Sequence, residues 1–247
     1  MNKKISFQKV TPILEHHCVN CNLNALCITD RLDPKEIQLL ESIVRHPSSL
    51  SKGTTLFTKG ERFQSVYIVK SGCIKTHIMD GKKMEKVTRF YFPGDLIGLN
   101  AVNYDYYYDT ATAIETSSLC QLSFEKLDKL SAKIPSLRRK ILHLMSRTIC
   151  DEQKMVQQLT QKNAEERIAA FLLSISNIFK ARGFSDTRFR LSMSRIEIAS
   201  YLGLTVETVS RALSRLHKIE YLIVDKREIT ILDFPGLHAL SSLNSRA

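Results

Sequence analysis

The chain has 247 residues, of which 43% are hydrophobic and 25% are charged, a balance typical of a globular protein with one large domain or two smaller ones. Its 9 glycines and 6 prolines exclude a collagen-like or low-complexity protein, and no apolar run approaches the roughly 18 residues of a membrane span, so we expect a cytoplasmic location and no membrane partner. The formal net charge of +11 favours a polyanionic partner, although the basic residues are spread along the chain.

Three cysteines stand close together near the start, in a segment without clear periodicity. Cys18, Cys21 and Cys27 have the spacing C-x2-C-x5-C, and clustered cysteines in a reducing compartment bind metal or do redox work more often than they form disulfides. A [4Fe–4S] cluster needs four thiolates. A zinc site usually has two C-x2-C pairs, of which one is present here, and His16 or His17 can complete it. Free redox-sensing thiols are a third option. A thiol oxidoreductase using Cys18 and Cys21 is a fourth, but the strand that should precede its cysteine pair is missing.

A short helix and a series of strands follow. Asp33 before Pro34 predicts the start of a helix over 33–40. From about residue 50 to 125, short β-rich runs alternate with glycine-containing turns, and this pattern indicates an antiparallel sandwich or roll. The runs are 54–57, 65–70, 73–79, 85–92 and 117–124.

A helical period replaces the strands after about residue 136. Six residues spaced alternately three and four apart predict the apolar stripe of a coiled coil. This apolar stripe consists of Leu142, Met145, Ile149, Glu152, Val156 and Leu159. Glu152 either lies at a wet, splayed part of the stripe, or two subunits pair along the helix and their Glu152 carboxylates approach each other. In the second case repulsion makes pairing finely balanced, which suits a switch.

Asn163 predicts the start of a helix, because it forms a capping box. Farther along the chain, residues 194–218 predict two helices around a glycine turn. Ser194 and Glu197 form another capping box, Gly203 ends the helix that it begins, and Thr205 caps the next one. We expect the buried face of the first of the two helices to consist of Ile196, Ile198, Ala199 and Leu202. This is a helix-turn-helix, whose second helix enters the major groove of DNA.

The outward face of that second helix carries side chains that can read bases. Arg211 can donate two hydrogen bonds to guanine, Glu207 can accept one from cytosine, and Ser210 can contact either kind of edge. The predicted DNA-binding residues are Thr205, Glu207, Thr208, Ser210 and Arg211. Two β-runs around the basic turn 225–227 then predict a hairpin wing suited to phosphate contact.

A roll, a long helix and a winged helix-turn-helix, in this order, resemble the cyclic-AMP receptor superfamily over nearly the whole chain. Within it, the stretches KNAEERIAAFL (162–172) and SYLGLTVETVSR (200–211) are similar to the fumarate and nitrate reductase regulator (FNR) family. The nucleotide pocket differs from that of cyclic-AMP binders, because no arginine follows the Pro-Gly turn and because Asp105 and Asp109 would repel a phosphate. We therefore expect no cyclic nucleotide.

The resemblance also implies a cofactor and a mechanism. The FNR family holds a [4Fe–4S] cluster on its N-terminal cysteines and on one cysteine of the roll, so Cys18, Cys21, Cys27 and Cys120 are the expected ligands. In that family the cluster promotes dimerisation and binding to TTGAT-like inverted repeats without oxygen, and both are lost when it is oxidised. RNA polymerase is a further implied partner. Leu26, beside Cys27, is expected to shield the cluster from oxygen or water.

We therefore predict an α+β fold and an oxygen-responsive, homodimeric transcriptional regulator rather than an enzyme. The expected parts are a cysteine segment (1–30), a β-roll or jelly-roll sensor domain (31–135), a dimerisation helix (136–162) and a winged helix-turn-helix domain (163–247). The alternative is a DNA-binding regulator of the cyclic-AMP receptor type that senses a small ligand, with zinc on its N-terminal cysteines.

Overall fold

The computed structural model describes residues 18–81 and 84–242, and it confirms the predicted β-roll. Two four-stranded antiparallel sheets, ordered β1-β8-β3-β6 and β2-β7-β4-β5, form the roll. The strands are β1 (Val44–Arg45), β2 (Thr55–Phe57), β3 (Ser65–Ser71), β4 (Ile74–Met79), β5 (Glu85–Tyr91), β6 (Leu96–Ile97), β7 (Thr110–Ala113) and β8 (Ser118–Ser123). The sequence pattern missed β1, β6 and β7. Strands β1 and β6 have only two residues each, too few to show an alternation, and β7 alternates threonine with alanine, which is a weak strand signal.

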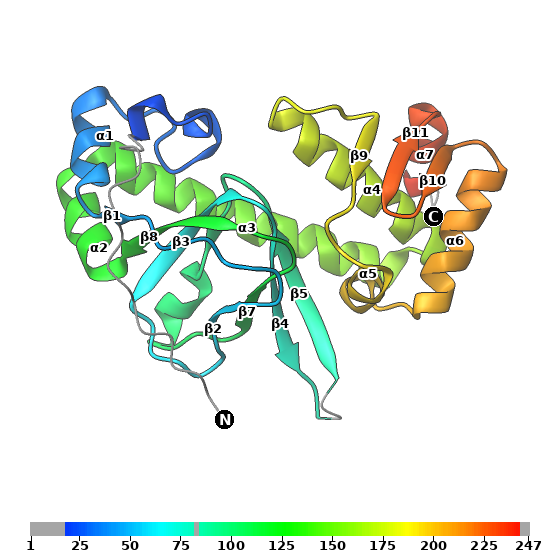
Figure 1. The fold of residues 1–247 in the computed structure, drawn as a ribbon, viewed down its shortest axis with the longest axis horizontal. Coiled ribbons are helices and arrows are strands. Elements are labelled where there is room, and N and C mark those ends of the chain that lie inside the picture. The colour runs from blue at the N-terminus through cyan, green and yellow to red at the C-terminus, as the bar shows by residue number, and fades with distance from the viewer. Residues whose placement is uncertain (1–17, 82–83, 243–247) are drawn as a thin grey trace.

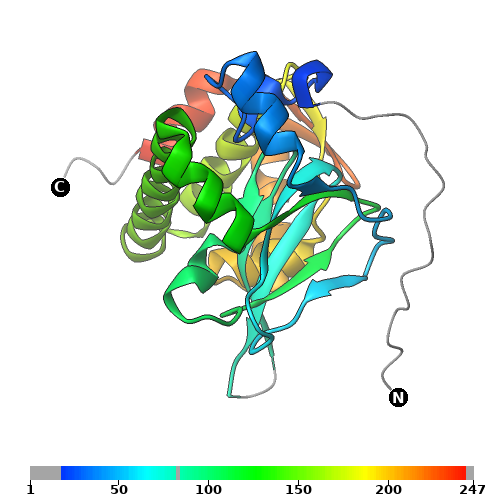
Figure 2. The same cartoon turned by 90° about the vertical axis from the view of Figure 1, so that its left-hand side faces the viewer.

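Helices and 3₁₀ turns cover one end of the roll. The predicted helix near Asp33 is confirmed, with Asp33 accepting a hydrogen bond from the backbone of Glu36 at 2.8 Å. Both views place this helix and the turns that follow Cys18 (blue) at the same end of the molecule (Figure 1 and Figure 2). The elements at this end are η1 (Cys18–Asn20), η2 (Asn24–Leu26), α1 (Pro34–Glu41) and α2 (Phe124–Lys133). A further 3₁₀ turn, η3 (Leu99–Asn103), follows β6 and buries Ala101 in the same cluster as Phe57.

Aromatic side chains fill the space between the two sheets. The rings of Phe57 and Tyr107 stack with their centroids 3.7 Å apart, and the Tyr107 hydroxyl donates to the Ser65 carbonyl at 2.7 Å. Asp109 is also buried, where it accepts hydrogen bonds from Thr88 and Asn100. The expectation that no cyclic nucleotide binds stays a prediction.

A single long helix, α3 (Pro135–Gln161), connects the roll to the C-terminal half (Figure 1). Four apolar members of the stripe on α3 are exposed: Leu142, Met145, Ile149 and Val156. Leu159 is half-buried, because its side chain lies beside Gly203 of the helix-turn-helix: a Cβ added at Gly203 would be 3.8 Å from Leu159 Cδ2. The stripe is therefore an uncovered surface of the single chain over most of its length.

No helix in the described part of the chain is both long and apolar enough to cross a membrane.

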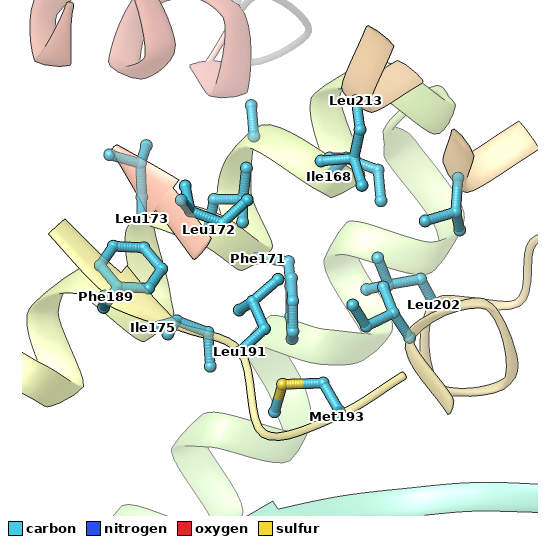
Figure 3. Close-up of a cluster of buried hydrophobic side chains, with 14 of the residues drawn as sticks. Ile168, Phe171, Leu172, Leu173, Ile175, Phe189, Leu191, Met193, Leu202 and Leu213 are labelled. Carbon is cyan, nitrogen blue, oxygen red and sulfur yellow. The ribbon is translucent and has the colours of Figure 1, made fainter. Parts of the chain in front are cut away.

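The core of the C-terminal half is continuous with buried residues of the roll, such as Val87 and Phe90, and α4 supplies it with several apolar side chains. Ile168, Phe171, Leu172, Leu173 and Ile175 of α4 face residues from the wing and from the two helices of the helix-turn-helix (Figure 3). A three-stranded sheet ordered β10-β11-β9 forms the wing, to which the sequence pattern assigned only two strands. The elements are α4 (Ala164–Ala181), β9 (Arg188–Arg190), α5 (Arg195–Leu202), α6 (Val206–Lys218), β10 (Leu222–Asp225), β11 (Glu228–Ile231) and α7 (Phe234–Ser242).

The capping boxes at Asn163 and Ser194 are confirmed, but one residue of the predicted buried face of α5 is wrong. Ile196 is 68% exposed, whereas Ile198, Ala199 and Leu202 are buried. The physical reason is helical period, since Ile196 lies about 200° around the axis from Ile198. The division of the chain into four parts stays a prediction.

The winged half packs directly on the roll. Ser200 of α5 accepts a hydrogen bond from the Val87 backbone N–H and donates one to the Glu85 carbonyl, both at 2.9 Å. Beside it, Lys75 of β4 forms ion pairs with Glu85 and with Glu197, the latter at 3.2 Å. Strand β5 therefore fixes the position of the helix-turn-helix relative to the roll.

Candidate nucleic-acid interface and cysteine site

The helix α6 has the amphipathic arrangement that the sequence predicts. Thr205 is its N-cap, and the Thr205 side chain accepts a hydrogen bond from the Thr208 backbone N–H at 3.1 Å. Val209, Leu213 and Leu216 are buried against the rest of the domain. The opposite side of α6 is therefore directed away from the core.

The predicted base-reading residues lie on that opposite side. Glu207 and Arg211 are exposed, while Thr208 and Ser210 are half-buried. The Ser210 hydroxyl accepts a hydrogen bond from Nη1 of Arg195, the first residue of α5, at 3.1 Å. Arg195 thus brings a second exposed guanidinium to this surface. The sequence analysis missed Arg195, although its place beside the N-cap Ser194 was a signal that could have found it.

The wing adds further basic side chains, but not all those expected. Lys226 at its tip is exposed, whereas Arg227 is half-buried and donates to the Ser192 carbonyl at 3.0 Å. Arg188 and Arg190 of β9 are exposed. The wing therefore offers cations suited to phosphate contact from β9 as well as from its tip.

A second candidate site brings together cysteines from two distant segments. Cys18, Cys21, Cys27 and Cys120 all line one cavity, and Cys120 is held on β8 opposite Ile68 of β3. Its other lining residues are Leu23, Ile28, Thr29, Leu40, Val44, Ile68 and Lys70. Four soft ligands in a largely apolar wall are the donor set that an iron–sulfur cluster needs.

The electrostatics of the cavity disfavour bare thiolates. Burial, together with repulsion from neighbouring cysteines, raises the pKa of Cys18 to about 12 and that of Cys120 to about 11. Burial also raises the pKa of Cys27. Four thiolates here need a bound cation to compensate them, and Lys70 contributes one positive charge at the wall.

Further observations bear on what the cysteines can hold. All six cysteines are free of disulfides. Among residues 18–81 and 84–242, no three His, Cys, Asp or Glu side chains are arranged so that they could hold a metal ion. His16 and His17, named for the zinc alternative, lie outside the described residues. His46 Nδ1 lies 3.7 Å from Cys120 Sγ, a neighbour that sequence spacing could not reveal.

Leu26 does not line this cavity. It packs on the turn after β5, where a Cβ added at Gly94 would be 2.9 Å from the Leu26 Cβ, and Gly94 has a φ of +95°. Only glycine permits this close approach with this backbone conformation. The cysteine segment therefore rests on the end of β5, while Leu23 and Ile28 line the cysteine cavity.

Comparison with known proteins gives a consistent assignment. Residues 166–240 match the Crp-like helix-turn-helix domain, and residues 47–133 match the cyclic nucleotide-binding domain. The transcriptional activator protein FnrA of Stutzerimonas stutzeri is 44% identical over 94% of this chain and 96% of its own length. The chain belongs to the FNR/Anr family of CRP/FNR transcriptional regulators.

Two further comparisons agree with membership of the FNR/Anr family. The anaerobic regulatory protein of Haemophilus influenzae is 41% identical over 92% of this chain and 89% of its own length. The structure of FixK2 from Bradyrhizobium japonicum superposes with a TM-score of 0.74 and 28% identity, and covers 80% of this chain and 97% of that protein. As an FNR/Anr regulator, this chain is a DNA-binding transcription factor and not an enzyme.

Proposed function

We propose that this chain regulates transcription in response to oxygen, and that Cys18, Cys21, Cys27 and Cys120 hold a [4Fe–4S] cluster. The observation that carries the proposal is the convergence of all four cysteines on one cavity, although about 90 residues separate Cys120 from the others. The names of its relatives, which include an anaerobic regulatory protein, support the same function. When bound, the cluster supplies a group whose reaction with oxygen changes the ligation of these cysteines.

Two polar contacts connect α3 to the cysteine segment and to α1, the helix that follows it. Lys140 Nζ of α3 lies 2.7 Å from Oδ2 of Asp30, three residues after Cys27. Ser136, also on α3, donates to Glu36 at 2.5 Å. Lys140 is only two residues before Leu142, at the start of the apolar stripe, so ordering of the cysteine segment acts directly on the helix that carries the stripe.

Two chains pair along this stripe in the proposed active form. Pairing places two α6 helices about one DNA turn, roughly 34 Å, apart, which is the geometry for an inverted repeat. Arg211, Glu207 and Ser210 contact bases of a TTGAT-like half-site, Thr205 and Thr208 lie at the helix start beside the backbone, and RNA polymerase is the protein partner. Coupling between cluster and DNA then needs only a small free-energy difference between monomer and dimer.

Metal analysis under anaerobic conditions tests the proposal. Protein purified without oxygen should contain about four iron and four sulfide per chain, and exposure to air should change its visible spectrum and convert dimer to monomer. Cys120→Ser should lose the iron, whereas Cys150→Ser should retain it, because Cys150 is exposed on α3 outside the cavity. Stoichiometric zinc, or iron retained in Cys120→Ser, would contradict the proposal.

One observation favours the alternative regulator that senses a small ligand. A cavity of about 400 Å³ lies between β5, α3 and α4, and it is lined by aromatic residues such as Tyr91, Phe92 and Tyr201 together with charged ones. This volume lies within the range of small-molecule sites. Zinc in place of iron, with a dimer indifferent to air, would support this alternative.

A further inference from the structure

The side chain of Arg89 links the roll to the one charged residue of the apolar stripe. From β5, Arg89 Nη1 lies 3.3 Å from Glu152 Oε1, and Arg89 Nη2 lies 3.0 Å from Asp151 Oδ2. The Arg89 side chain is 22% exposed, against 56% for Glu152. The guanidinium is also 5.6 Å from the centre of the Tyr91 ring. Three neighbours therefore hold Arg89 in one orientation.

The pairing changes the charge that Glu152 brings to the stripe. Glu152 occupies a position at which the same residue of a second chain would approach it, and two unpaired carboxylates there would repel. A carboxylate that is bound by a guanidinium of its own roll is partly neutralised, and its oxygens are drawn to the side of α3 that faces the roll. Arg89 thus reduces the repulsion that would oppose pairing.

We infer that Arg89 is a positioning residue for dimerisation: it holds Glu152 against the roll and so permits α3 of one chain to pair with α3 of a second copy. This inference rests on the proposed function, because it assumes that pairing occurs along the stripe. The inference also makes dimerisation depend on the roll, because a displacement of β5 from α3 would leave the Glu152 carboxylate without Arg89 in the stripe.

The position of Arg89 also connects this contact to the cysteine segment. Strand β5 continues from Arg89 into the turn at Gly94, on which Leu26 lies. A conformational change in the cysteine segment would therefore act on β5, the strand whose Arg89 binds Glu152. Asp30 and Lys140 act on α3 from its other end, so the two contacts reach the stripe through different elements.

A double-mutant cycle measured as a dimer dissociation constant tests the inference. The variants are Arg89→Gln, Glu152→Gln and the double variant, each loaded with cluster anaerobically and analysed by sedimentation equilibrium. Arg89→Gln should weaken the dimer more than tenfold when Glu152 is present and less than threefold when residue 152 is glutamine. The lysine variant R89K should recover part of the loss, because it keeps a positive charge beside the two carboxylates.

Arg215→Gln is the matched control, since Arg215 also pairs with a carboxylate, Glu165 at 3.0 Å, but lies on α6 away from the stripe. It should leave the dimer constant unchanged. Equal weakening by Arg89→Gln in both backgrounds, no weakening at all, or tighter pairing would each overturn the role of Arg89. A wild-type chain that carries its cluster and stays monomeric would instead contradict the proposed function, and this inference with it.

Discussion

Truncation of Ile149 tests whether the apolar stripe is the surface on which two chains pair. Ile149 lies near the middle of α3 and is 59% exposed in the single chain. Complete burial of an isoleucine side chain stabilises by about 1.5–3 kcal/mol. Burial of the 59% that is exposed would therefore contribute about 0.9–1.8 kcal/mol per chain on pairing. Alanine keeps one of the four side-chain carbons, so the variant loses about three quarters of this contribution.

Two chains lose this contribution together, so Ile149→Ala should destabilise the dimer by about 1.5–2.5 kcal/mol. That corresponds to a dissociation constant raised about 10- to 60-fold. Sedimentation equilibrium on anaerobic, cluster-loaded protein measures the constant directly. Leu39→Ala is the control, because Leu39 on α1 is 52% exposed but lies outside the stripe. If both variants weakened the dimer equally, or neither did, α3 would not pair through this surface.

Three further variants test the DNA-reading helix and the contact between the roll and α5. Arg211→Ala should reduce discrimination at one guanine by about 1–3 kcal/mol in a DNA titration; equal weakening on random DNA would make Arg211 a phosphate contact. Burial raises the pKa of Glu197, but hydrogen bonds at the N-terminus of α5 and the charge of Lys75 outweigh it, so the pKa is lowered from its ordinary value. The ionised form therefore stabilises the fold above the unfolded-state pKa of about 4.3, and this contribution is lost as the pH falls through the folded-state value. Glu197→Gln should accordingly flatten the acid limb of a stability–pH profile below about pH 4.5, and an unchanged limb would contradict the assignment. Ser200→Ala should lower the free energy of unfolding in a denaturant titration by about 1–3 kcal/mol, because it leaves a buried strand N–H unpaired; the same loss in Ser174→Ala, whose hydroxyl bonds only to its own helix, would refute this reason.

Elements set by neighbouring residues could be predicted from the sequence. The predicted capping boxes at Asn163 and Ser194 each depend on residues three positions apart, and both are present, as is the predicted N-cap at Asp33. The helix-turn-helix follows from the same local signals together with Gly203, which adopts a left-handed conformation at the end of α5. Such features need no knowledge of the rest of the chain, because the interacting groups are fixed relative to each other by the helix itself.

Contacts between distant segments could not be predicted in this way. Cys120 is a single cysteine on a strand, and without a resemblance to a family nothing in its spacing connects it to the cysteines of the N-terminal segment. Arg89 and Glu152 are 63 residues apart, and Lys140 and Asp30 are 110 residues apart. Hydrophobic period identifies which face of an element is buried, but not which charged side chain of another element will lie opposite it.

Glu152 shows why this limit matters for function. Read along the helix, it is an unfavourable charge in an apolar stripe; in the folded chain it is half of an ion pair with the roll. A tenfold shift between monomer and dimer requires about 1.4 kcal/mol, which is comparable to one hydrogen bond to a charged group. Under the proposed pairing, each contact that joins the roll or the cysteine segment to α3 is therefore comparable to the free energy that would move the equilibrium tenfold. If two chains pair along the stripe as proposed, the loss of one such contact would shift the equilibrium toward the monomer and separate the two recognition helices without an extensive rearrangement.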